Sequence, residues 1–502
     1  MADITTYEQI TYAEAQRLLQ TRLDGIALPT KQQIEARAKF DNDDHWQDGK
    51  GFIGQLPSGD DASDRLALLR AGFCPENVIA EVLDTHIENV LGDEPQISLE
   101  AEGVSESELE SNLEIVKEWF DYRNNLEVLS NGLRIALRDK ASVPRAFVPS
   151  GMMTGSNQTV KAKDLKDALS KIWFRSETLE KGGVIVNEDT ATELGLFLYR
   201  MRVNQTDISF AEYAYLRDET TIWGNISAHE QQLGQEDPDI LQLGGRLPIT
   251  ELKAKPLITE SVCQMQRALN LSNTMLTRNN NLAGSRERLL INVQPRGEWV
   301  ENGTDADGNA KMKFVPEPMA TGPGTMNFLQ SQAVRDTAGV ETAFANPNVI
   351  FTDPVPIESF TGTRDFWYRN ILAKCKQRHI LMQDDATASG RSRIEARKEF
   401  EASLQKSKAA VDPVGAWMIE IALNLAAHFM GKPGMFLNYR AKFDAQVSVS
   451  ELTAEESAEI RNDYAAGLLD KETAITLQQR KNVGEILDRL KKMPAPPAPP
   501  TN

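Results

Sequence analysis

The sequence predicts an α+β protein that is mainly helical, and three observations carry this prediction. A long amphipathic stretch, Ala388–Met430, has helical periodicity throughout. Short stretches of alternating apolar and polar residues follow one another between residues 165 and 250, which predicts a strand-rich module. Two further helical stretches, Pro256–Leu282 and Glu358–Arg378, flank a segment rich in strand-forming residues. At 502 residues the chain is long enough for several domains.

Apolar residues recur at steps of three and four along the longest stretch, and only Ser407 interrupts them. They are Phe400, Leu404, Val411, Val414, Met418, Ile421, Leu425 and Phe429. One helix of this length would extend roughly 60 Å. Pro413 predicts a kink inside it, because proline lacks the N–H that the helix needs. Gly431 and Pro433 predict its end, and we expect it to need more partner surface than a lone monomer offers.

The net charge of −18 disfavours a protein that grips DNA phosphates tightly, although weak contact through local basic patches stays open. Cys74, Cys263 and Cys375 lie far apart without CxxC spacing, which indicates a reducing compartment and neither a disulfide framework nor a zinc site. The N-terminus has no apolar signal region. The most apolar helix, Val414–Met430, carries three polar residues on one face, so we expect a buried helix and no membrane partner.

The N-terminal third is predicted to be largely helical. Residues 1–40 have helical spacing, and a loop rich in aspartate follows at Asp41–Pro57. Asp41, Asp43, Asp44 and His45 in this loop are metal-ligand types, but without a second ligand group at a recognisable spacing we expect a solvated turn. A helix is predicted after Pro75 with His86 as a core histidine, and Glu106–Arg138 predicts one or two more helices.

The remaining elements follow from the same patterns. Pro256–Leu282 carries an apolar face and a polar face free of acid, the latter formed by Arg267, Asn270, Thr274, Thr277 and Asn281. GTDADGNA resembles the start of a calcium loop, but it lacks the glycine and glutamate of that loop and predicts a hairpin turn. Glu358–Arg378 is the most basic helix. After the long helix we expect a strand, a helix pair with Gly467 as a cap, and a disordered proline-rich tail.

Signals for catalysis are absent from the sequence. There is no phosphate-binding loop of the G-x-x-x-x-G-K-[ST] type, and neither H-E-x-x-H nor G-x-S-x-G occurs. GKGFIG matches a dinucleotide-binding pattern by letters only, because it follows no predicted strand. We therefore expect no enzymatic activity, no cofactor and no metal.

The order of these parts resembles that of bacteriophage portal proteins from long-tailed phages. The residues that carry the resemblance occur in this order: Asn77–Pro95, Gly245–Glu251, Gln264–Ala283, Ala388–Phe400 and AAGLLDKETAI near the C-terminus. Each segment alone is weakly specific, but together they span most of the chain.

The resemblance implies a portal fold that forms a ring of about twelve subunits at one capsid vertex. It implies the following regions: a wing at 1–255, a first stem helix at 256–283, a clip at 284–353, a second stem helix at 354–378, a tunnel loop at 379–389, the long helix and strand of the wing at 390–449, a crown at 450–493 and a tail at 494–502. Such a ring is the channel for double-stranded DNA during packaging and ejection. It is assembled in the host cytoplasm and becomes part of the virion.

The resemblance also implies site residues and partners. The channel residues of the stem and tunnel loop would be Arg267, Arg278, Arg364, Arg369, Lys374, Lys376, Arg378, Asp384 and Asp385. The clip surface would include Trp299, Lys311 and Lys313. Implied partners are further copies of the chain, non-specifically bound DNA, terminase, a head–tail adaptor, and the major capsid and scaffold proteins.

Several alternatives stay open at this stage. The basic residues of the second stem helix either face the lumen or pair with acids of a neighbouring subunit. Asp384 and Asp385 either repel the DNA backbone or pair with basic residues of an adjacent loop. The protein as a whole is alternatively another virion assembly protein, such as an adaptor or capsid subunit, or a soluble enzyme whose acidic site assembles in space.

Overall fold

A computed structural model of the chain confirms the α+β class, with about 51% helix and about 24% strand. The model describes residues 10–25, 28–47, 62–148, 161–187, 192–203, 206–228, 238–284, 288–295, 297–304, 310–317, 329–331, 333–335, 341–344, 346–351, 355–383, 390–448 and 454–477. The chain divides into two compact units, which are described separately below. Helices α8 (Glu260–Gly284) and α9 (Ile357–Lys374) each contribute to both units.

Unit 1 comprises Met1–Gln47, Asn77–Gln266 and Tyr368–Asn502. Besides parts of α8 and α9, its helices are α1 (Tyr12–Leu23), α2 (Lys31–Asp41), α4 (Val78–Leu91), α5 (Glu106–Tyr122), α6 (Asn125–Asp139), α7 (Leu165–Leu169), α10 (Arg378–Gln383), α11 (Gly390–Phe429), α12 (Ala454–Ala465) and α13 (Lys471–Leu477). Its strands are β1 (Gln96–Ala101), β2 (Ala141–Phe147), β3 (Trp173–Glu177), β4 (Gly182–Asn187), β5 (Thr192–Val203), β6 (Thr206–Arg217), β7 (Thr220–Ser227), β8 (Asp239–Leu241), β9 (Leu252–Lys253) and β18 (Tyr439–Asp444).

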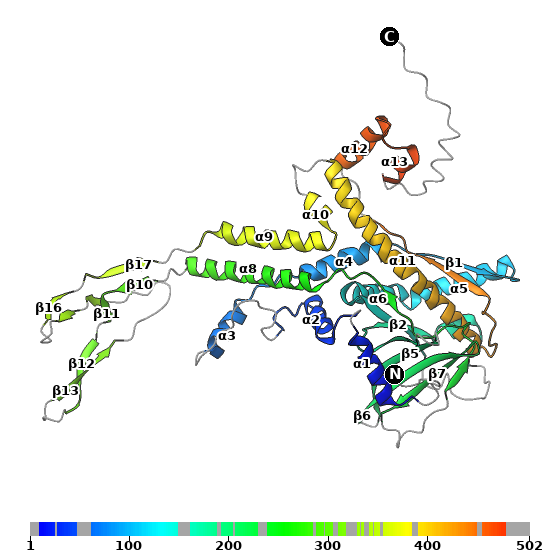
Figure 1. Ribbon diagram of the computed structural model, residues 1–502, viewed down its shortest axis with the longest axis horizontal. Helices are drawn as coiled ribbons and strands as arrows, with labels where there is room; N and C mark the ends of the chain where they lie inside the picture. The colour runs from blue at the N-terminus through cyan, green and yellow to red at the C-terminus, as the bar shows by residue number, and fades with distance from the viewer. Residues whose placement is uncertain are drawn as a thin grey trace, which may run out of the picture. The chain divides into compact units, whose positions relative to one another are not determined.

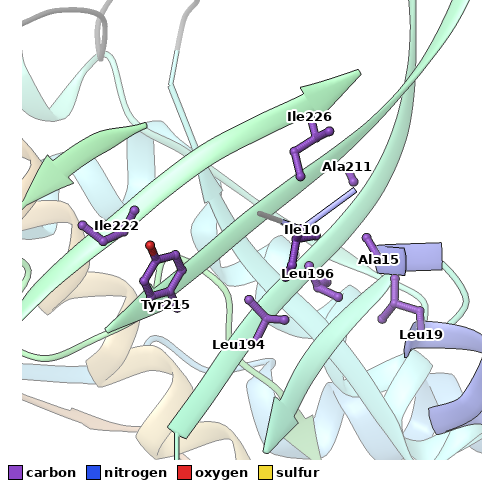
Figure 2. Close-up of a cluster of buried hydrophobic side chains, with 9 residues drawn as sticks. All are labelled: Ile10, Ala15, Leu19, Leu194, Leu196, Ala211, Tyr215, Ile222 and Ile226. Atoms are coloured by element: carbon purple, nitrogen blue, oxygen red, sulfur yellow. The ribbon is translucent and has the colours of Figure 1, made fainter. Parts of the chain in front are cut away.

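The strand-rich module predicted between residues 165 and 250 is present in unit 1. Strands β4 to β8 form one sheet in chain order, and each neighbouring pair is antiparallel. Leucine, isoleucine and tyrosine side chains from alternate positions of β5, β6 and β7 pack against α1 (Figure 2). A second sheet has the order β3-β2-β9, and β1 pairs with β18 across a large sequence separation.

The longest predicted helix is confirmed as α11, which has 40 residues and continues through Pro413 (Figure 1). Every apolar residue of the predicted row is buried, from Phe400 to Phe429. The expectation that this helix needs partners outside the monomer is wrong, because α4, α6, α7 and β18 of the same unit cover it. Gly431 adopts a φ of 70° directly after the helix, which fits its predicted role in ending it.

Polar residues on one face of α11 fasten it to the rest of unit 1. Glu420 accepts a hydrogen bond from the backbone N–H of Ala441 at 3.0 Å and forms an ion pair with Arg246. The Nε2 of His428 accepts from the N–H of Gln242 at 2.9 Å. By length and composition Ser392–Phe429 is the one helix in the described ranges that passes as a candidate membrane span. Of its apolar window 67% is buried inside the protein, as in the core helix of a globular domain.

A close contact between α11 and β18 yields a first prediction. A Cβ added to Gly415 would lie 2.4 Å from the Cγ of Phe443. Gly415→Ala should therefore lower the free energy of unfolding by about 1–3 kcal/mol through overpacking. Gly362→Ala is the matched control, since no atom lies within 4 Å of a Cβ at this helical position; alanine should stabilise it by up to about 1 kcal/mol. Chemical denaturation of both variants checks the pair, and equal effects at the two glycines would contradict the packing argument.

The N-terminal region differs from the prediction in two respects. Residues 12–41 form two helices instead of one, because a segment with Gly25 and Pro29 separates them and Thr30 caps α2. The described start of the aspartate-rich loop is solvated only in part: Asn42, Asp43 and Asp44 are exposed as predicted, but the residues on either side of them are buried. Asp41 is buried and binds Arg134 and Arg138, and the side chain of His45 is buried as well. Residues 1–9 and 48–61 lie outside the described ranges.

The middle helices agree with the prediction. Glu106–Arg138 forms two helices, α5 and α6, which Asn124 separates with a φ of 52°. His86 on α4 is fully buried, and its Nε2 lies 2.8 Å from the Oγ of Ser407 on α11. The predicted helix pair near the C-terminus is α12 and α13, and Gly467 between them has a φ of 73°.

Unit 2 comprises Asp48–Glu76 and Arg267–Trp367. It contains α3 (Ala62–Ala71), parts of α8 and α9, and the strands β10 (Arg288–Ile291), β11 (Val293–Pro295), β12 (Gly297–Thr304), β13 (Ala310–Pro316), β14 (Leu329–Ser331), β15 (Ala333–Arg335), β16 (Glu341–Phe344) and β17 (Asn348–Phe351). These strands form antiparallel pairs: β10-β17, β11-β14, β12-β13 and β15-β16. The predicted hairpin at GTDADGNA is confirmed, because Thr304 and Ala310 close the β12-β13 pair.

Candidate functional site

The two predicted stem helices are present with changed ends. The first, α8, begins at Glu260 instead of Pro256, since Thr259 precedes it and its Oγ1 accepts from the N–H of Val262 at 3.4 Å. The second, α9, ends at Lys374 instead of Arg378, because Lys376 adopts a φ of 67°. The predicted tunnel loop at 379–389 is also wrong at its start: residues up to Gln383 belong to the short helix α10.

Within unit 2 the segment Cys74–Glu76 lies against α8. Asn270 and Thr274 on α8 are fully buried, and their side-chain oxygens each accept a hydrogen bond of 3.2 Å from the backbone N–H of Glu76 and Cys74. Asn273 donates to the carboxylate of Glu76 at 3.1 Å. The polar face of α8 therefore provides hydrogen-bond partners for the backbone of Cys74–Glu76, and at these positions it is not free to bind a ligand.

Arg364 on α9 binds the same segment. Its Nε and Nη2 donate to the two carboxylate oxygens of Glu76 at 3.1 and 2.5 Å, and its Nη1 donates to Asp365 at 2.9 Å. Hydrogen bonding to Glu76 raises the pKa of Arg364. Arg364 is therefore paired with acidic residues of its own chain, a third arrangement that the sequence-based alternatives did not include.

The two hydrogen bonds between Arg364 and Glu76 predict that lysine at position 364 would hold this contact less well. Arg364→Lys loses one arm of the bidentate contact with Glu76. We expect α9 amides near residue 364 to open more easily by about 1–2 kcal/mol. Hydrogen exchange in the full chain measures this opening. Arg369→Lys on the same helix is the control, since Arg369 is exposed and forms no ion pair with any described residue; unchanged exchange in Arg364→Lys would refute the expectation.

The far end of α8 is tied to the start of α9 by an amide. In unit 2 the side chain of Asn279 donates to the backbone oxygen of Val355 at 2.8 Å and accepts from its N–H at 2.9 Å. Figure 1 shows α9 beside α8 in this unit. Phe366 on α9 is 56% exposed, so an apolar ring lies on the outer surface of this helix.

Four of the predicted basic channel residues are exposed and lack an ion-pair partner in the part of the chain that the structure describes. They are Arg278 in unit 2 and Arg369, Lys374 and Arg378 in unit 1. Lys376 differs from them, because its Nζ lies 2.5 Å from the carboxylate of Glu399. Arg267 is half-buried on α8 and is engaged in further contacts. Asp384 and Asp385 lie outside the described residues.

The predicted clip residues lie on the β12-β13 hairpin. Trp299 is opposite Phe314 in the register, and Lys313 is opposite Val300. Lys313 is exposed, as are Val300 and Val315 on the same face. Lys311 lies near the start of β13. The side chains of Trp299 and Lys311 are outside the described part of the structure.

Cys263 near the start of α8 and Cys375 just after the end of α9 are buried and poorly placed to react. In unit 1 the Sγ of Cys375 lies 3.8 Å from the backbone oxygen of Leu257. Burial, together with the neighbouring Cys263, raises the pKa of the Cys375 thiol to about 12. Both cysteines are buried and neither forms a disulfide. Because of its raised pKa, Cys375 is protonated at neutral pH and behaves as a small apolar side chain.

Among the described residues, His86 and Ser407 place a candidate base beside a hydroxyl group. Both side chains are buried, and burial lowers the pKa of His86 to about 4. A serine enclosed in this way cannot meet a substrate. Within the ranges that the structure covers, no group of three or more His, Cys, Asp or Glu residues is arranged to hold a metal ion.

Comparison with known proteins gives no further assignment: no family model matches the chain, and no curated protein matches it. The site is therefore defined by this structure alone. Sequence reasoning missed Glu76, the partner of Arg364. The two residues are 288 positions apart, so no periodicity or motif links them.

Proposed function

We propose that this chain is the subunit of a phage portal, a ring through which double-stranded DNA enters and leaves the capsid. One observation carries the proposal: two helices, α8 and α9, bracket an insert built only of paired strands among its described residues, and the 40-residue helix α11 follows them. A channel needs long elements that pack side by side around an axis, and two long helices joined through a separate insert suit that need.

In this proposal the parts of the chain have separate tasks. Helices α8 and α9 form the stem, and the β10–β17 insert forms the clip that meets terminase during packaging and the head–tail adaptor afterwards. The α11 helix belongs to the wing, and α12 and α13 belong to a crown inside the capsid. Catalysis is assigned to the separate terminase.

The charges of the stem helices favour weak contact with DNA. Arg369, Lys374 and Arg378 are exposed without an ion-pair partner among the described residues of their unit, whereas the chain as a whole has a net charge of −18. A few cations in an acidic channel give transient phosphate contacts that do not stall moving DNA. We no longer propose Arg364 and Lys376 as DNA contacts, because Glu76 and Glu399 already neutralise their charges.

The proposal is tested first by the mass of the purified full chain, measured by native mass spectrometry with electron microscopy of the same sample. A ring of about twelve copies with a central channel is the expected result. A protein that stays monomeric even with capsid and scaffold proteins present would exclude the portal assignment.

The lumen assignment has its own test. Alanine at Arg369, Lys374 and Arg378 together should leave ring assembly intact and weaken the dependence of packaging rate on salt, because up to three phosphate contacts are lost. Lys442→Ala is the control, since Lys442 is exposed and already pairs with Glu100. Packaging that responds to salt identically in the triple variant and the wild type would remove these residues from the lumen.

A further inference from the structure

Arginine and aromatic side chains meet on one surface of unit 1, where α5 ends beside β2 and β3. Phe147 and Trp173 are opposite in the register of these strands and stack with ring centroids 5.9 Å apart. The guanidinium of Arg123 lies 4.2 Å from the centroid of Trp173 and 5.3 Å from that of Tyr122. Arg175 lies 5.4 Å from the centroid of Phe147. We call these five residues the arginine–aromatic patch.

Neither arginine of the patch has an acidic partner in the described structure. Arg145, directly opposite Arg175, shows the difference: it pairs with the buried Glu212 and stacks on Phe197. Arg123 is partly desolvated, which lowers its pKa, and its Nε is buried without a hydrogen-bond partner. A guanidinium packed over a ring is already restricted in its motion, so it loses little freedom when a carboxylate binds to its remaining N–H groups.

The composition of the patch favours a protein partner over nucleic acid. Tyrosine, tryptophan and arginine are the residues that dominate binding energy in protein interfaces, and Tyr122 is 74% exposed. Nucleobases would need free ring faces for stacking. The faces of Phe147 and Trp173 are engaged by each other and by the two arginines. Apart from the exposed ring of Tyr122, the outward groups of the patch are the two guanidinium cations, which suit carboxylates.

The same chain carries an acidic surface that complements the patch. Glu106, Glu110 and Glu114 recur every four residues along α5, so they form one stripe, the α5 acidic stripe. All three are exposed and form no ion pair with a described residue, although Glu118 at the next position pairs with Lys166. Like charges at this spacing repel one another in an isolated helix. A positively charged surface packed against the stripe would offset this repulsion.

The stripe and the patch cannot meet within one chain. They lie toward opposite ends of α5, which has 17 residues and extends roughly 25 Å. Glu114, the stripe residue nearest the patch, is separated from Arg123 by roughly 13 Å of helix. We propose that the α5 acidic stripe of one copy docks on the arginine–aromatic patch of a second copy. This inference deepens the proposed function, on which it rests, by naming a lateral contact of the ring.

Charge exchange in the full-length protein tests the contact. Glu110→Lys with Glu114→Lys should raise the concentration for half-assembly at least tenfold, and Arg123→Glu with Arg175→Glu should do the same. Combining all four changes in one chain should restore assembly to near the wild-type level, because the opposed charges are exchanged. Analytical ultracentrifugation measures these shifts. Glu81→Lys with Glu88→Lys is the matched control, because these α4 glutamates are exposed and form no ion pair with a described residue.

A second variant has glutamine at the three stripe positions, Glu106, Glu110 and Glu114, and leaves Arg123 unchanged. It should weaken assembly without lowering the thermal transition, because it removes the repulsion between the glutamates. Rings that assemble normally in every variant would overturn the contact and leave the portal proposal standing. If the protein forms only a closed dimer without a channel, and the charge-exchange variants weaken and restore that dimer as expected, the contact is supported and the portal proposal is overturned. A wild-type chain that never self-associates overturns both. Single-stranded oligonucleotide binding that Arg123→Glu abolishes, with assembly unchanged, would assign the patch to nucleic acid instead.

Discussion

Acidification from pH 6.5 to pH 4 is expected to weaken unit 1 strongly, because two buried histidines must gain a proton. The pKa of both His86 and His379 is lowered from 6.5 to about 4, by burial in His86 and by burial together with the nearby positive charge of Arg397 in His379. His86 packs edge-on against Phe400, and His379 stacks on the same ring at 4.2 Å. The two side chains therefore hold α4 and α10 against α11.

The sign of the effect follows from proton binding. A histidine with a lowered folded-state pKa binds protons more weakly in the folded protein than in the unfolded chain. Its contribution to stability is complete above pH 6.5, declines between 6.5 and 4, and is constant at lower pH. For His86 alone the loss is roughly 3 kcal/mol. Denaturant unfolding at a series of pH values, followed by tryptophan fluorescence, measures it.

A matched variant isolates this effect from other titrating groups. His86→Leu with Ser407→Ala removes both partners of the 2.8 Å contact and leaves apolar groups in their place. Its stability should fall less between pH 6.5 and 4 than that of the wild type. Burial raises the pKa of Asp139 and Glu212, which opposes the trend in both proteins and cancels in the comparison. Parallel pH profiles would show that His86 is not responsible.

Asp41→Ala is expected to destabilise the protein by about 1.5–3 kcal/mol, because it removes the carboxylate that Arg134 and Arg138 share and leaves the buried Arg138 with Asp139 as its one acidic partner among the described residues. One carboxylate oxygen of Asp41 accepts from Arg134 at 2.6 and 2.9 Å, and the other accepts from Arg138 at 2.9 Å. Arg138 is 5% exposed. These bonds join the last residue of α2 to two successive turns of α6, so the substitution also frees one helix from the other.

Asp84→Ala is the control for this prediction, since Asp84 binds the same Arg134 from a side chain that is 53% exposed. A solvated ion pair of this kind contributes about 0–1 kcal/mol. Urea denaturation of the two variants should therefore separate them clearly. Similar losses in both would mean that water reaches Arg138 and that the network is not desolvated.

Local patterns predicted most elements because the causes of those elements are local. The predicted helix Ala388–Met430 matches α11 to within two residues at its start and one at its end. Alternation of apolar and polar residues predicted strands β3 to β7, but it did not predict the short strand β8. Positions where the prediction failed depend on partners far away in the chain. Asp41 was expected to be solvated like the aspartates that follow it, because the arginines that bury it lie about a hundred residues further on.

The candidate site was predicted in part. Sequence reasoning identified the exposed cations of α9 and its surroundings, because a high density of arginine and lysine is visible in any window. It did not predict that Arg364 forms an ion pair whereas Arg369, five positions further along the same helix, is exposed. Only Arg364 faces Glu76, and this depends on how α9 packs beside Cys74–Glu76 in unit 2.

The sequence by itself determined which segments are helices and strands, since backbone preference and side-chain periodicity act within a few residues. Tertiary structure alone decided which charges are neutralised, which polar faces are buried, and that α11 finds its partner surface within its own chain. The physical reason is that desolvation and ion pairing depend on the distance between side chains in space. Contacts such as Arg364 with Glu76 join residues that are far apart in the sequence, so no local sequence pattern indicates them.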